Sequence, residues 1–211
     1  MDSQVASTYG WKSDKAPCSC GYLAPLVIDL IKDMNITRVA DLGAGNGALC
    51  ASLHDAQREV VGIEYDKEGV DLASARYPHI RFYNFGVQDD PAELLATEAP
   101  FGAVVSTEVI EHLFSPHLLP KYANRILKKD GYLIVSTPYH GYFKNLALSI
   151  LDGWDVHHTP LWHGGHIKFW SRNTLTRLLT ENGFEVVGFH GVGRVPYLWK
   201  SMVLVARKTA G

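Results

Sequence analysis

The chain has 211 residues, 46% apolar and 20% charged, a composition typical of one ordinary globular domain. Its 20 Lys and Arg against 22 Asp and Glu give a formal net charge of −2 without any block of like charge, which argues against nucleic-acid binding. No basic, apolar leader pattern and no apolar run of about 18 residues occur, so we expect a cytoplasmic protein without a membrane span. The three cysteines are then expected as reduced thiols.

Five apolar segments bounded by turn residues predict buried strands in the first two-thirds of the chain. These strands are expected at 37–42, 59–64, 80–85, 101–107 and 131–137, and helical patterns separate them at 48–56, 67–76, 91–96 and 116–129. Strands that alternate with helices form βαβ units, so the sheet should be mostly parallel.

The end of the chain departs from this alternation. Ser171 is expected to cap a helix that ends at Gly183, and two further strands are predicted at 184–190 and 200–207 with no helix between them. Such a pair should be antiparallel. We therefore expect one α/β domain over 1–211: a doubly wound, Rossmann-like sheet of seven strands, mostly parallel, with one antiparallel strand near the C-terminus and helices on both faces.

The segment 139–170 fits no strand–helix cycle, although 142–152 could form a short helix. It holds five of the ten histidines and three of the five tryptophans. An insertion after a parallel strand lies at the carboxyl ends of the strands, where open α/β sheets bind ligands. We expect 139–170 to form a lid over an acceptor pocket lined by aromatic side chains. The segment 1–20 is expected to close the cleft as a flap, with Trp11 as its anchor.

The strongest local motif is VADLGAGNG, at 39–47, between the first strand and the first helix. Glycines there permit positive φ and close approach of a ligand to the backbone. Glu64 follows Gly45 by 19 residues, the spacing at which a carboxylate binds ribose hydroxyls. A dinucleotide site and a tight turn without ligand remain alternatives. Asp41 favours a nucleoside with a cationic tail, because a carboxylate at the strand end opposes a pyrophosphate.

Four motifs occur in order: VADLGAGNG, GIEYD, STEVIEHLFSP and the terminal strand pair. Together they resemble the class I S-adenosylmethionine-dependent methyltransferases, and most closely the small O-methyltransferases of the ubiquinone-biosynthesis type. The resemblance implies S-adenosylmethionine as methyl donor, S-adenosylhomocysteine as product and a small molecule as acceptor. It also implies a cofactor site made by Asp41, Gly43, Gly45, Asn46, Gly47, Glu64, Tyr65, Val87, Gln88, Thr107 and Glu108.

Within that resemblance, the glycines line the methionine part of the cofactor and Asp41 lies near its amino group. Glu64 binds the ribose hydroxyls, and Tyr65 packs beside the adenine. The turn after the third strand departs from the common pattern of the family, which leaves either Gln88 or Asp89 as the acceptor for the adenine amine.

The segment after the fourth strand carries Glu108, Glu111 and His112, spaced to share one face if a helix starts there. We expect His112 to act as a general base toward the acceptor, with Glu108 and His166 as further catalytic residues. The alternatives are a purely structural role and half of a metal site completed by His163 or His166.

The metal alternative has a parallel in small-RNA 2′-O-methyltransferases, which bind a divalent ion through a Glu-x-x-Glu-His segment and a distant histidine. The chain lacks a basic surface for RNA, so a metal-dependent RNA methyltransferase ranks below a small-molecule enzyme, and no metal is expected. A nucleoside-binding protein without turnover is a further alternative. The sequence indicates no oligomeric state.

Overall fold

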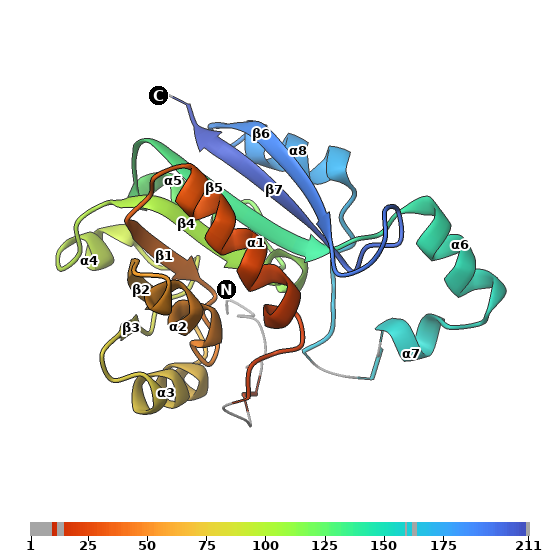
Figure 1. Cartoon of the computed structure of the whole chain (residues 1–211), viewed down its shortest axis with the longest axis horizontal. Coiled ribbons are helices and arrows are strands. Elements are labelled where there is room, and N and C mark those ends of the chain that lie inside the picture. The colour runs from red at the N-terminus through yellow and green to blue at the C-terminus, as the bar shows by residue number, and fades with distance from the viewer. Residues whose placement is uncertain (1–9, 12–14, 159, 162–163, 210–211) are drawn as a thin grey trace, which may run out of the picture.

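Seven strands form one sheet in the order β3-β2-β1-β4-β5-β7-β6 (Figure 1). The computed structural model describes residues 10–11, 15–158, 160–161 and 164–209. The strands are β1 Arg38–Leu42, β2 Glu59–Ile63, β3 Arg81–Tyr83, β4 Phe101–Thr107, β5 Leu127–Pro138, β6 Phe184–Val192 and β7 Ser201–Lys208.

All neighbours from β3 to β5 are parallel, whereas β7 runs antiparallel to both β5 and β6. The predicted sheet, with its single reversed strand, is confirmed. The strand order reverses direction between β1 and β4, so the crevice at the carboxyl ends of these strands is where a ligand is expected.

Helices cover both faces of the sheet, as predicted (Figure 1). Alternate residues of β1 enter different cores: Val39 packs with α1 and α2, whereas Ala40 and Leu42 pack with α4, α5 and α8. The helices are α1 Cys20–Asp33, α2 Ala48–Asp55, α3 Lys67–Arg76, α4 Pro91–Leu95, the 3₁₀ turn η1 Ile110–His112, α5 Leu118–Ile126, α6 Tyr142–Ile150, α7 Trp154–His158 and α8 Arg172–Thr180.

Several helices begin at the capping residues that the sequence offers. The Asp66 carboxylate accepts the N–H of Glu68 at the start of α3. At α8 the Ser171 hydroxyl accepts the N–H of Thr174, whose side chain accepts the N–H of Ser171 in return. These caps fix where the chain leaves a strand end and enters a helix, and so they fix the loops around the crevice.

The structure adds one helix and corrects two expectations. Helix α1 was not predicted. The helix expected over 116–129 ends at Ile126, because Leu127 already pairs with Phe101 as the first residue of β5. The expected common helix face of the Glu108 segment does not form either, because Glu108 adopts φ 55° and only η1 follows it.

The insertion projects beyond the carboxyl end of β5 as α6 and α7, neither of which has a buried residue (Figure 1). Its returning part, 164–170, packs back against η1 through backbone hydrogen bonds. Trp162 and His163 lie outside the described residues. Among the described helices, none is long and apolar enough to cross a membrane.

Candidate active site

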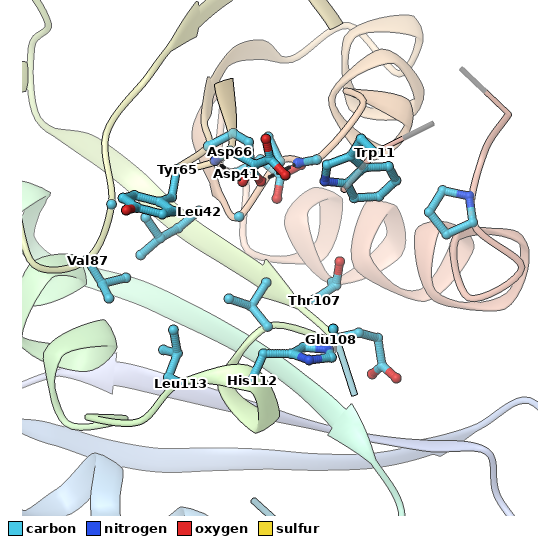
Figure 2. A pocket seen from close by; sticks show the side chains of 18 of the residues that line it. Trp11, Asp41, Leu42, Tyr65, Asp66, Val87, Thr107, Glu108, His112 and Leu113 are labelled. Carbon is cyan, nitrogen blue, oxygen red and sulfur yellow. Dashed lines mark hydrogen bonds between the residues drawn. The ribbon is translucent and has the colours of Figure 1, made fainter. Parts of the chain in front are cut away.

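A cavity of about 540 Å³ opens at the carboxyl ends of β1, β2 and β4. Figure 2 shows its walls, to which the glycine loop, the turn after β3, the end of β4 and Trp11 contribute. Every residue that the resemblance placed in the cofactor site lines this cavity except Gly47. A volume of several hundred Å³ is typical of small-molecule sites.

The glycine loop is shaped for close approach. Gly43 and Gly45 adopt φ 87° and 55°, which side chains on Cβ disfavour. A Cβ at Gly43 would collide with the Val109 side chain, and one at Gly45 would collide with the Trp11 ring. The loop is held because the N–H of Gly43 donates to the Ile63 carbonyl at 2.8 Å. Both glycines therefore leave backbone exposed to a ligand where any side chain would collide.

The last two residues of the motif have other contacts. The Asn46 amide donates to the Lys15 carbonyl at 2.8 Å, which ties the N-terminal segment to the loop. Gly47 starts α2 and faces Phe82 and Ala73 instead of the cavity. Gly47 thus serves the packing of α2, and Asn46 holds the N-terminal segment against the glycine loop.

Glu64 lies at the centre of the loop's hydrogen bonding. One carboxylate oxygen accepts the Gly45 N–H and the other accepts the Asp66 N–H, both at 2.7 Å. Burial raises the pKa of Glu64, and these backbone donors oppose that rise. Because a carboxylate can accept about four hydrogen bonds, capacity for two hydroxyls remains.

Asp41 is 1% exposed and has a single hydrogen bond among the described residues, from the Cys50 thiol at 3.3 Å. Its Oδ1 has no described partner. Burial raises the pKa of Asp41 to about 7, and the nearby Glu64 carboxylate adds to this rise. A buried carboxylate with one unpartnered oxygen favours a cationic ligand at this end of the cavity.

The turn after β3 holds Gln88 and Asp89, the two candidate hydrogen-bond acceptors for the adenine amine, in different positions. The Asp89 carboxylate accepts the Gly86 N–H at 2.7 Å and does not line the cavity. Gln88 lines the cavity, with its amide against Gly86. Tyr65 and Val87 lie at this same end (Figure 2), and Tyr65 is 40% exposed.

The N-terminal segment covers the glycine loop. The Gly10 N–H donates to Asp66 at 3.0 Å, and the Trp11 indole packs on Gly45 and Gly69. Trp11 also lines the cavity (Figure 2). That 1–20 acts as a flap stays a prediction. Its neighbours Tyr9 and Lys12 lie outside the described residues.

Glu108 ends β4 and lines the cavity together with Thr107. Its carboxylate accepts the Ser136 hydroxyl at 2.7 Å and the Ser201 hydroxyl at 3.1 Å, and it points away from the His112 ring (Figure 2). Burial raises the pKa of Glu108 to about 7. The two serines come from β5 and β7 and were not predicted from the sequence.

A cluster beside the cavity brings together Glu111, His112 and His166. The alternative of a metal site had named His166 as a possible partner of this segment. The Glu111 side chain is 1% exposed, and its Oε1 lies 3.9 Å from His112 Nε2 and 4.0 Å from His166 Nε2. The two imidazole rings meet edge to face at 4.9 Å between centroids. Of the three residues, only His112 lines the cavity.

The aromatic residues of the insertion gather elsewhere. His158 stacks on Trp154 at 4.8 Å, and Phe169 meets both His158 and His140 edge to face at 5.1 Å. Burial lowers the pKa of His140 to about 4, and Lys144 contributes further. None of these side chains lines the cavity, to which the insertion contributes Gly164, Gly165 and Ile167. That 139–170 acts as a lid over aromatic walls stays a prediction.

The sheet order, the reversed β7 and a glycine-loop cavity at the β1–β4 crevice define a class I S-adenosylmethionine-dependent methyltransferase. Residues 21–188 match the family model described as a methyltransferase domain. The chain therefore belongs to this family, whose cofactor is S-adenosylmethionine.

Two sequence relatives support this assignment. A probable S-adenosylmethionine-dependent methyltransferase of Mycolicibacterium smegmatis is 31% identical over 159 residues, which cover 74% of this chain and 56% of the relative. A ubiquinone biosynthesis O-methyltransferase of Maricaulis maris is 27% identical over 167 residues, covering 75% and 63%. The chain thus spans somewhat over half the length of these curated relatives.

Solved structures show the same fold. The magnesium protoporphyrin IX methyltransferase of Synechocystis, with S-adenosylhomocysteine bound, superposes with a TM-score of 0.62 at 19% identity, covering 89% of this chain and 82% of that one. A didemethyltoxoflavin N1-methyltransferase of Burkholderia thailandensis gives a TM-score of 0.63 at 18% identity, covering 89% and 77%. The predicted family and cofactor are confirmed, whereas the relatives named above include both an O-methyltransferase and an N1-methyltransferase.

Proposed function

We propose that this chain transfers the methyl group of S-adenosylmethionine to a hydroxyl oxygen of a small molecule. The observation that carries the proposal is the position of the His112 imidazole on the wall of a cavity that also holds the glycine loop, Glu64 and Asp41. One end of the cavity suits the nucleoside and its amino-acid tail, and the other end carries groups that can act on an acceptor.

The cofactor is proposed to extend along the cavity. Its adenine lies beside Tyr65 and Val87, and its ribose hydroxyls donate to Glu64. Its ammonium group pairs with the unpartnered oxygen of Asp41, where a cation offsets the cost of the buried charge. The sulfonium then lies beside Thr107, on the side of the cavity where His112 is found (Figure 2).

Methyl transfer forms one O–C bond and breaks one C–S bond, whose electron pair stays on the sulfur. The donor is already activated, so the protein mainly aligns oxygen, carbon and sulfur. A hydroxyl must also lose its proton, and help with that step contributes about 10²–10⁴-fold. An amine or thiol acceptor needs less of this help, so a polar cluster beside the methyl group favours oxygen.

His112 is suited to this place by its hydrogen bonding. Its Nδ1 lies 3.2 Å from the Gly165 carbonyl, and a proton on Nδ1 makes Nε2 the nitrogen with the lone pair. Burial lowers the pKa of His112, which favours the neutral ring. Glu108 is proposed as a positioning residue, because its carboxylate binds Ser136 and Ser201 across to β5 and β7.

The proposal is tested with methyl-labelled S-adenosylmethionine and matched acceptor pairs that differ only by hydroxyl or amine, with a short RNA as a further acceptor. We expect label in hydroxyl compounds and formation of S-adenosylhomocysteine. Glu64→Gln should weaken cofactor binding at least tenfold, whereas Glu68→Gln, an exposed neighbour outside the cavity, should not. Transfer to amines or RNA alone, or no cofactor binding, would contradict the proposal.

A further inference from the structure

We propose that the methyl acceptor carries a carboxylate group, which binds to basic side chains of the insertion. These side chains, which we call the basic cluster, are His140, Lys144, His157 and His158. That the bound group belongs to the acceptor rests on the proposed function, whereas the binding of a carboxylate to the basic cluster does not.

Ring contacts hold the basic cluster together. His158 stacks on His140 at 5.8 Å between ring centroids and meets His157 edge to face at 4.7 Å. Both ring nitrogens of His158 are buried, and neither has a hydrogen-bond partner among the described residues. Because a buried polar group without a partner is costly, a ligand that accepts a hydrogen bond from this ring would be favoured.

Lys144 has capacity for a further partner. It is half-buried, and its ammonium group donates to the Tyr139 carbonyl at 2.8 Å, which leaves two of three donors without a described partner. Among the described residues, no carboxylate forms an ion pair with Lys144 or with Arg194, whose charge also acts on Lys144. The acidic residue of α7, Asp155, is exposed. A half-buried ammonium without a counter-ion favours an anionic ligand.

The charge of the basic cluster suits a monoanion. Burial lowers the pKa of Lys144 to about 8, Arg194 adds to this fall and Glu108 opposes it, so the ammonium is mostly protonated at neutral pH. Burial, and then the charge of Lys144, lower the pKa of both His140 and His157 to about 4, so these rings are neutral N–H donors. One ammonium with neutral donors balances a carboxylate, whereas a phosphate brings a charge of about −1.5 to −2.

The basic cluster begins where the cavity ends. The His166 ring lies 4.9 Å from that of His112, which lines the cavity. Ile167 also lines the cavity, and Phe169, two residues further on, meets His158 at 5.1 Å. An acceptor whose hydroxyl lies at His112 can therefore extend another of its groups toward the basic cluster.

Exposed rings flank the basic cluster and indicate what the carboxylate is attached to. Trp154 stacks on His158 at 4.8 Å and is 42% exposed, and Phe169 is 55% exposed. Ring faces beside an anion site favour a flat apolar group next to the carboxylate. Benzoate is therefore the probe, with benzamide as its uncharged isostere.

The first test measures binding to the full chain, without an affinity tag, through the histidine ring signals in NMR. We expect benzoate to bind at least tenfold more tightly than benzamide, and more tightly than inorganic phosphate. It should shift the signals of His140, His157 and His158 but not that of His79, which packs on His54.

Variants of Lys144 carry the control. Lys144→Met should weaken benzoate binding at least tenfold, Lys144→Arg should retain the preference over benzamide, and Lys121→Met, an exposed lysine of α5, should change nothing. Helix α6 projects from the sheet without a buried residue (Figure 1), so the variants should fold. Lys144 does not line the cavity, so they should bind S-adenosylmethionine within about threefold of the wild type.

The second test compares hydroxyl compounds with and without a carboxylate as methyl acceptors. We expect faster labelling of the carboxylates, and Lys144→Met should raise their KM at least tenfold with kcat nearly unchanged. Equal binding of benzoate and benzamide, tighter binding of phosphate, or labelling of uncharged hydroxyl compounds alone would overturn the inference and leave the proposed function standing. Transfer to amines alone contradicts the proposed function, whereas Lys144-dependent benzoate binding would still support the carboxylate site.

Discussion

Replacing Asp41 by Asn should stabilise the cofactor-free protein and weaken cofactor binding. The carboxylate is fully buried, and burial raises its pKa from 3.8 to about 7. A shift of about 3 units corresponds to about 4 kcal/mol at 1.36 kcal/mol per unit. This is the upper limit of the cost of holding Asp41 ionised in the fold above pH 7.

Part of that gain is lost in the variant. The Asn oxygen can still accept the Cys50 thiol, but the new NH₂ group takes the place of Oδ1, which has no described partner. A buried donor without a partner costs about 1–3 kcal/mol. We therefore expect Asp41→Asn to raise the free energy of unfolding by about 1–3 kcal/mol at pH 8.

The pH dependence gives the sign of the effect. Between pH 3.8 and about 7 the folded wild type keeps a proton on Asp41 that the unfolded chain has lost. Wild-type stability therefore falls as pH rises through this window and levels off above it. The advantage of Asp41→Asn should be about 2–3 kcal/mol larger at pH 8 than at pH 5.

Urea unfolding at the two pH values, without cofactor, measures this difference. Asp66→Asn is the matched control, because Asp66 is also buried in the cavity wall but accepts the N–H groups of Gly10 and Glu68. It should bring no gain. For Asp41→Asn, calorimetry at pH 8 should show S-adenosylmethionine affinity reduced at least about tenfold, the loss of one charge-assisted hydrogen bond. A stability change that is the same at pH 5 and pH 8 would refute the reasoning.

Three other substitutions test the cover, the glycine loop and a helix cap. Trp11→Ala should raise the Kd for S-adenosylmethionine about tenfold, because the indole over Gly45 is lost; an unchanged Kd in calorimetry would remove Trp11 from the site. Gly45→Ala should abolish cofactor binding, and adding Trp11→Ala should restore stability in thermal melts without restoring binding, since the clash is with the ring but φ is 55°. Ser171→Ala should cost about 1 kcal/mol in urea unfolding and leave cofactor affinity unchanged; no loss of stability would show that the capping box is dispensable.

The sheet could be predicted because each strand is a short apolar run between turn residues. Helix α1 also had a readable signal: Leu23, Val27 and Ile31 recur at the helical period and are all buried. The early start of β5 had none, because Leu127 completes a helical pattern and only its pairing with Phe101 on β4 makes it the first residue of a strand. Pairing across a sheet is a long-range contact that local pattern does not encode.

The cofactor side of the site was also predictable, because its residues are close together in the sequence. The glycine loop is contiguous, so its residues reach the cavity together, and Glu64 follows at a fixed spacing. The partners that hold these groups were not predictable: Cys50 donates to Asp41 from the first turn of α2, and Ser136 and Ser201 bind Glu108 from strands far along the chain. Such contacts follow from the register of the sheet and not from the motif.

The acceptor side shows what backbone conformation adds to a motif. Glu108 and Glu111 are three residues apart and would share a face of a helix, but φ 55° at Glu108 separates them. The Glu108 carboxylate turns toward Ser136 and Ser201, which satisfy it. The Glu111 carboxyl group turns toward the His112 and His166 rings, at 3.9 and 4.0 Å. The same residue type thus has two different chemical needs within one segment. Because the two hydrogen bonds of Glu108 join the end of β4 to β5 and β7, the positioning role is placed at Glu108.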